Sequence, residues 1–174
     1  MKKEPDSVRR KGELNAKTCL DALNEAFGEV PAPTASPLYR SNGLDAGHLV
    51  RNWQGQTRRT LADPQTPLNG TGEDLDYMSL DWLFYFLPGL MERTLADPKR
   101  MDEIIVCKLI DLLLNDEGSQ PAATLLSRLS KPQMHALHSW VTWIGINIKS
   151  FFLPEYSYRQ RIKALRRKLR PPIK

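Results

Sequence analysis

The sequence predicts an all-α protein, a single compact helical domain of five to seven helices with a basic C-terminal helix. Apolar residues recur at the 3.6-residue period of a helix, and the two-residue alternation typical of strands is missing. Serine or aspartate followed by proline recurs before apolar stretches, a common start of a helix. The 174 residues, 41% of them hydrophobic, suffice for one domain with its own core.

The N-terminal half contains one clear helix followed by irregular segments. Apolar residues at helical spacing predict a helix over about 15–27, which Gly28 ends. Three prolines require an extended chain over 30–37, and a short helix is possible near 46–53. The segment 69–76, with two glycines and three acidic residues, is expected to be a solvated polar loop.

The C-terminal half contains the most apolar helices. Ser79 is expected to cap the first of them, and Pro88, which lacks a backbone donor, to kink or restart it before Leu90. Further helix starts of the Ser/Asp–Pro type follow at Asp97, Ser119 and Ser130.

One hexapeptide, Arg-Thr-Leu-Ala-Asp-Pro, occurs at 59–64 and again at 93–98. The offset between the copies equals the period of tetratricopeptide repeats, but the aromatic and small residues of that repeat are missing. We interpret the two copies as one helix-end and capping solution used twice; the alternative is the remnant of a duplication.

The net charge of +5 is unevenly distributed along the chain. Residues 1–11 carry +3 and residues 159–174 carry +8, which leaves −6 for the residues between them. This layout predicts three parts. They are a flexible basic N-terminus at 1–12, an acidic helical domain at 13–155 and a basic amphipathic C-terminal helix and tail at 156–174.

The C-terminal helix is expected to combine a narrow apolar stripe of Ile162, Leu165 and Leu169 with a basic face. The basic residues are Arg159, Arg161, Lys163, Arg166, Arg167, Lys168 and Arg170. Three alternatives stay open: the helix docks on the acidic body, grips nucleic acid by its phosphates, or rests on an anionic membrane. We rank them in that order.

Motifs for catalysis, cofactors or metals are not found in the sequence. His135 and His138 share a helical face at metal-ligand spacing, but no third ligand accompanies them, so we expect no metal. Neither Cys19 nor Cys107 is paired with a histidine in a nucleophile motif. The two glycines of 69–76 lack the pattern of a nucleotide-binding loop. We therefore predict a protein that is not an enzyme and has no cofactor.

The location predicted from the sequence is cytoplasmic. The longest apolar stretch, 80–91, is too short to span a bilayer. The N-terminus lacks the apolar region of a signal peptide. The two cysteines are expected to be buried thiols in a reducing compartment.

Several short motifs between about 16 and 147 resemble a family of small bacterial helical domains of unknown function. They are Ala26-Phe27 with Val30-Pro31-Ala32-Pro33, Trp53-Gln54-Gly55, Tyr77 through Met91 with its Tyr-x-Leu-Pro, and Leu129-Ser130-Lys131-Pro132-Gln133. The chain departs from the family at Asp81-Trp82-Leu83, and the basic tail after Tyr158 lies outside the pattern. The resemblance implies a helical fold and a bacterial origin, and it implies no activity or catalytic residue.

Together these observations predict a non-enzymatic protein-binding module, for example an immunity or inhibitor-type partner of a bacterial toxin. Its partner is expected to be a protein with an oppositely charged surface. The candidate contact residues are Glu73, Asp74, Asp76 and Trp143. The alternative is a nucleic-acid-binding protein that uses the basic C-terminal helix, and the oligomeric state is not predicted.

Overall fold

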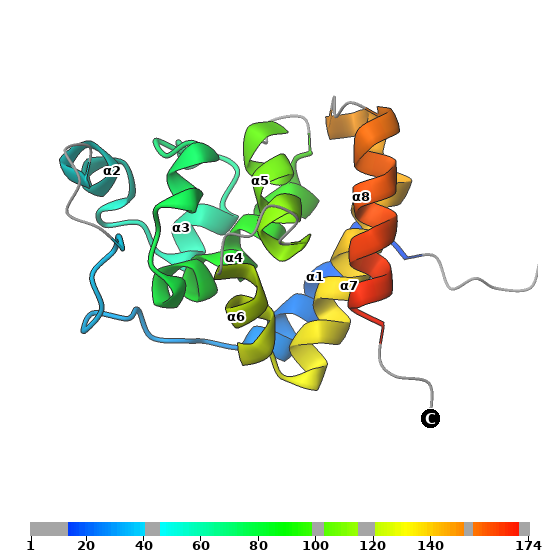
Figure 1. The fold of residues 1–174 in the computed structure, drawn as a ribbon, viewed down its shortest axis with the longest axis horizontal. Helices are drawn as coiled ribbons and strands as arrows, with labels where there is room; N and C mark the ends of the chain where they lie inside the picture. The colour runs from blue at the N-terminus through cyan, green and yellow to red at the C-terminus, as the bar shows by residue number, and fades with distance from the viewer. Residues whose placement is uncertain (1–13, 41–45, 99–102, 115–120, 152–154, 171–174) are drawn as a thin grey trace, which may run out of the picture.

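The computed structural model describes residues 14–40, 46–98, 103–114, 121–151 and 155–170, and every regular element in these ranges is helical (Figure 1). The α-helices are α1 (Ala16–Phe27), α2 (Ala46–Trp53), α3 (Arg58–Ala62), α4 (Leu80–Ala96), α5 (Glu103–Leu114), α6 (Pro121–Arg128), α7 (Lys131–Ile146) and α8 (Glu155–Lys168). Two short 3₁₀ helices are η2 (Glu73–Asp76) and η3 (Ile148–Phe151). The predicted all-α fold is confirmed.

Capping residues explain several of the helix boundaries. Asn15 and Ser130 each accept the backbone N–H of the third helical residue, whose side chain bonds back, so α1 and α7 both begin with a capping box. Gly28 ends α1 with a φ of 52°, which glycine adopts without strain. The five-residue α3 is outside the sequence prediction, although Thr57 and Thr60 form a capping box at its start.

The central helix of the core is α4, with eleven of its 17 residues buried, so it has almost no solvent face. It packs against α1, α3 and α6. The expected restart before Leu90 does not occur, since α4 continues through Pro88. Gly89 lets α3 approach, because a Cβ there would lie 2.5 Å from the carbonyl oxygen of Arg58.

Both copies of the repeated hexapeptide end a helix, as predicted, but the helix start that we also predicted at Asp97 is wrong, because Asp97 caps the C-terminal end of α4 and α5 is Glu103–Leu114. Asp63 and Asp97 are the C-cap residues of α3 and α4, and their backbone N–H groups donate to the carbonyl oxygens of Arg59 and Arg93. The two arginine side chains then differ. Arg59 is exposed, whereas Arg93 is buried and donates to three carbonyl oxygens in and just after the first copy. The second copy therefore helps to hold the first copy in place through the hydrogen bonds of Arg93.

Helix α7 packs between α1 and α8 and also reaches the central helix. The indole N–H of Trp140 donates to the hydroxyl of Thr94 in α4 at 2.7 Å, and both side chains are fully buried. A buried indole needs such a partner for its N–H, so this contact fixes the position of α7 on α4.

The last helix, α8, packs on α5 and α7 at one end of the molecule (Figure 1). Its apolar stripe enters the core, since Ile162, Leu165 and Leu169 are 4%, 0% and 1% exposed. The ammonium group of Lys168 donates to the carbonyl oxygen of Leu114, the last described residue of α5, at 2.9 Å. The docked alternative therefore describes this helix.

None of the helices in the described ranges combines the length and the hydrophobicity needed to cross a membrane. Cys19 is buried and Cys107 half-buried, and neither forms a disulfide. Burial raises the pKa of the Cys19 thiol to about 11, so this thiol stays protonated at neutral pH and is a poor nucleophile.

Candidate functional site

The acidic segment that we predicted as a partner surface is largely occupied by internal contacts. Asp74 is 5% exposed, and its carboxylate accepts the indole N–H of Trp53 at 2.8 Å and the backbone N–H of Thr71 at 2.9 Å. The indole lies so close to Gly70 that a Cβ there would come within 2.1 Å of the ring. Asp74 thus ties this segment to α2, and its prediction as a partner contact is wrong.

The other two acidic residues of the segment do reach the surface. Asp76 pairs with Lys108 of α5 at 2.5 Å while its side chain stays 42% exposed. This hydrogen bond raises the pKa of Lys108. Glu73 is exposed on η2. The predicted solvated loop is therefore a 3₁₀ turn with a buried carboxylate in its middle, and it does not present one continuous acidic surface.

The aromatic residue that we predicted as a partner anchor is also internal. Trp143 is 6% exposed, so it belongs to the core and the prediction is wrong. The exposed apolar side chain of this helix is Ile146, which is 66% exposed at the last position of α7. A single exposed apolar side chain is common on protein surfaces, so Ile146 bears on function only through the residues that lie beside it.

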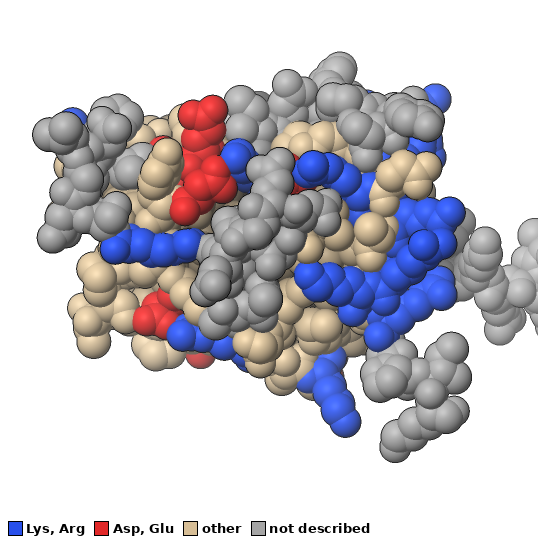
Figure 2. Space-filling view, in the orientation of Figure 1, with Lys and Arg blue, Asp and Glu red and all other residues tan. Residues whose placement is uncertain are grey.

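The seven basic residues predicted on the last helix divide into two sets. Arg161 and Lys168 are turned toward α5, where Arg161 forms an ion pair with Asp111 and Lys168 reaches the helix end. The other five, which we call the basic stripe, line a groove between α7 and α8: Arg159, Lys163, Arg166, Arg167 and Arg170. Figure 2 shows basic side chains gathered at the end of the molecule where α8 lies.

The groove has a volume of about 510 Å³ and two walls of different chemistry. The basic stripe forms the wall on α8, whereas Thr142, Gly145 and Ile146 form the wall on α7. The two helices come close beneath the groove, because a Cβ on Gly145 would lie 3.0 Å from the Cγ2 methyl of Ile162. The groove thus places an exposed apolar side chain beside a row of cations.

Most of the charge on the basic stripe is available to a partner. Within the described residues, no hydrogen bond or ion pair holds the side chains of Lys163, Arg167 or Arg170. All three side chains are exposed. Cations that are not neutralised by neighbouring carboxylates produce a positive potential over the groove, which attracts anionic groups.

The positive charges of the basic stripe also act on His138 of α7, which is half-buried. Burial lowers the pKa of its imidazole most, and the charges of Arg166, His135 and Arg170 lower it further. The Nε2 atom of His138 and the Nε atom of Arg166 are buried and find no hydrogen-bond partner within the described residues. His135 is exposed, and the described ranges contain no group of three side chains suited to a metal ion.

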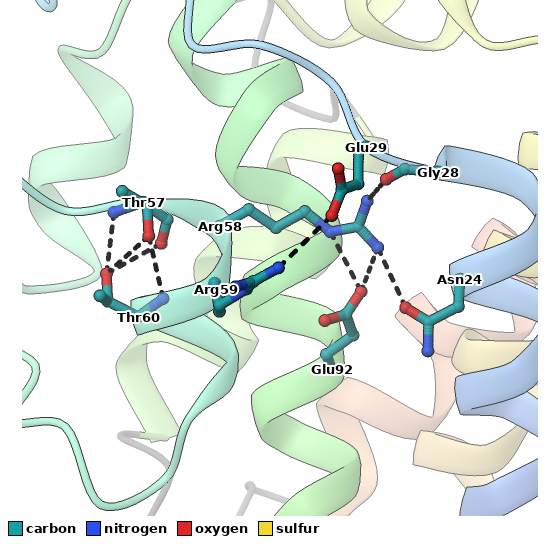
Figure 3. A network of polar contacts seen from close by, with 8 residues as sticks. All are labelled: Asn24, Gly28, Glu29, Thr57, Arg58, Arg59, Thr60 and Glu92. Carbon is teal, nitrogen blue, oxygen red and sulfur yellow. Dashed lines mark hydrogen bonds and ion pairs between the residues drawn. The ribbon is translucent and has the colours of Figure 1, made fainter.

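A second hollow, of about 870 Å³, lies between α1, α3 and α4 and was not found by sequence reasoning. Arg58 donates there to the carboxylate of Glu92, the carbonyl oxygen of Gly28 and the amide oxygen of Asn24 (Figure 3). Since these contacts involve all three guanidinium nitrogens, Arg58 serves to tie the segment after α1 to α4. Both arginines that line the hollow, Arg58 and Arg59, form ion pairs, with Glu92 and Glu29.

Comparison with known proteins finds no relative of this chain. No family model, no curated protein and no solved structure matches it. The resemblance to small bacterial helical domains therefore stays a prediction, and the groove between α7 and α8 is the feature of this chain that bears on its function.

Proposed function

We propose that this chain is a non-enzymatic protein-binding module that recognises a negatively charged protein through the groove between α7 and α8. The observation that supports this most is the arrangement of the basic stripe. Because α8 buries its apolar residues in the core, five basic side chains share a groove on the surface. A docked helix is already ordered, so binding does not have to compensate the entropy of folding it.

The distribution of charge favours encounter with an acidic partner. Residues 159–174 carry +8, and the basic stripe collects much of this charge on one face. Such a surface speeds association with a negative partner and disfavours a positive one. Association through it should weaken as salt screens the charges.

The wall on α7 favours a protein over nucleic acid as the partner. Ile146, 66% exposed, offers an apolar contact that a phosphate backbone does not use. The described residues that line the groove include no aromatic ring on which a base could stack. Nucleic acid is the alternative that the row of cations alone would also suit.

The form of this function that the sequence predicts is an immunity or inhibitor-type partner of a bacterial toxin, acting in the cytoplasm. In that form the toxin would present an acidic surface to the basic stripe. Binding of this kind requires a complementary surface and no catalytic group on this chain.

The proposal is tested by reversing charge in the groove and, as a matched control, elsewhere. The groove variant is Lys163→Glu with Arg167→Glu, and the control is Lys17→Glu with Arg51→Glu, which changes two exposed cations on α1 and α2. Both variants have the same net charge. Each tagged protein is used to capture partners from nuclease-treated extract of the native host, followed by mass spectrometry.

We expect a stoichiometric acidic protein with the wild type and the control, and its loss with the groove variant. Retention of that protein by the groove variant would contradict the proposal. If untreated extract gives only nucleic acid, and the groove variant alone abolishes a mobility shift at physiological salt, the nucleic-acid alternative replaces it.

A further inference from the structure

We infer that the segment bound in the groove is an amphipathic acidic helix that lies along α8, with an apolar side chain placed against Ile146. This inference rests on the proposed function and names the chemistry of the partner at the same site. It follows from the spacing of the cations, the chemistry of the opposite wall and the shape made by two packed helices.

Four of the five cations are spaced along one face of α8, and Arg170 follows two residues after the end of this helix. Arg159, Lys163, Arg166, Arg167 and Arg170 follow each other at intervals of three or four residues, with Arg166 and Arg167 sharing one level. At 1.5 Å per residue the part of the row within α8, from Arg159 to Arg167, is roughly 12 Å long, or about two turns. A second helix with carboxylates at the same intervals has the same spacing of charges. Its carboxylates can therefore pair with the cations of α8 on each successive turn.

The wall on α7 offers one exposed apolar side chain that an apolar residue of a partner could cover. Ile146 is exposed, and Gly145 beside it contributes no side chain above the contact with Ile162. An apolar residue of the partner would cover Ile146 while its carboxylates face α8. Apolar and acidic residues on adjacent faces of one segment, repeated over two turns, define an amphipathic helix.

The groove between two packed helices is also a natural seat for a third helix. Side chains of a third helix fit between the ridges of α7 and α8, which is the helix-in-groove mode of recognition. An extended segment rises about 3.3 Å per residue and points alternate side chains away, so it matches the pitch of the cations less well.

The test uses a peptide of about 18 residues with capped ends, which is roughly 27 Å long as a helix. Glutamates occupy one face at intervals of three and four, and leucines occupy the adjacent face. A second peptide has the same composition in an order that mixes the two faces. Binding is measured by fluorescence anisotropy at about 0.15 M salt, alongside a duplex DNA and vesicles with anionic lipid.

The decisive variant is Ile146→Ser, which removes an exposed apolar side chain and leaves every cation in place. Its matched control is Val30→Ser, which removes an exposed apolar side chain after α1, outside the groove. We expect the ordered peptide to bind the wild type and the control alike and to lose about tenfold in affinity for the Ile146 variant. The mixed peptide should bind weakly and equally to all three proteins.

Equal binding of the two peptides, an unchanged affinity after Ile146→Ser, or no binding of either peptide would overturn the inference. These outcomes leave the proposed function standing wherever capture of an acidic protein still depends on Lys163 and Arg167. Binding of duplex DNA or anionic vesicles in preference to the ordered peptide, with loss in the Lys163→Glu, Arg167→Glu variant, would overturn both.

Discussion

At the scale of single residues, the buried carboxylate of Asp74 is the strongest polar constraint in the acidic segment. Asp74 is 5% exposed and accepts two N–H groups, from the buried indole of Trp53 and from the backbone of Thr71. Without the carboxylate the indole N–H of Trp53, whose side chain is 1% exposed, would be buried and unsatisfied. The residue therefore stabilises the turn between α3 and α4 and is not available to a partner.

We predict that Asp74→Ala lowers the free energy of unfolding by about 2–4 kcal/mol, since it leaves charge-assisted hydrogen bonds unmade. The measurement is urea denaturation followed by circular dichroism. Glu73→Ala, one position earlier and exposed, should change stability by no more than about 0.5 kcal/mol. Equal effects of the two substitutions would show that the Asp74 contacts contribute nothing specific.

His138 provides a prediction about pH. Its pKa is lowered in the folded protein, by burial first and then by Arg166, His135 and Arg170, so the fold favours the neutral imidazole. The stability that this provides is complete above the unfolded value of about 6.5 and is lost as the pH falls through the lowered pKa. Stability should thus decline between about pH 7 and pH 5, and His138→Gln should flatten this part of the curve.

Urea denaturation of wild type and variants at several pH values measures this slope. A His138→Gln curve parallel to the wild-type curve would mean that folding does not lower the pKa of this imidazole.

Single-residue roles were the least predictable part of the sequence. The spacing of residues predicted a polar segment around Asp74 and a helix around Trp143. It could not predict whether other helices would bury these two side chains. Asp74 is buried by Trp53, 21 positions away, and the contacts of Arg58 reach Asn24 and Glu92, each 34 positions away. Such pairs depend on how helices pack, which local patterns do not encode.

At the scale of helices, local signals were more informative. Helices α1 and α7 begin directly after Asn15 and Ser130, and α1 ends directly before Gly28. The continuity of α4 across Pro88 was not predictable, because it depends on burial of the helix on all sides. Tertiary packing there outweighs the hydrogen bond that proline removes.

The attachment of α8 can be tested by one core substitution. We predict that Leu165→Ala lowers the free energy of unfolding by about 2–4 kcal/mol, since Leu165 is completely buried between α8 and its neighbours. Lys163→Ala, exposed on the same helix, should change it by no more than about 0.5 kcal/mol. Denaturant titration distinguishes the two, and a Leu165→Ala protein as stable as the wild type would show that α8 is not part of the core.

At the scale of the whole molecule, our prediction from the sequence set docking of the last helix against binding by it, as competing alternatives. The structure shows α8 docked, and the same docking arranges the basic stripe along a groove. The charge layout was visible in the sequence, whereas the division into inward and outward cations was not. That division depends on α5, which contributes Asp111 and its C-terminal carbonyls far along the chain.

The central claim is that the groove between α7 and α8 contacts an acidic protein. The most direct measurement places a photo-cross-linking amino acid at Gln160, a neutral residue that lines the groove, in cells that make the protein naturally. Gln54, exposed after α2, is the matched control position. We predict an acidic protein cross-linked from position 160 and not from position 54. The same adduct from both positions, or an adduct of nucleic acid from position 160, would contradict the account.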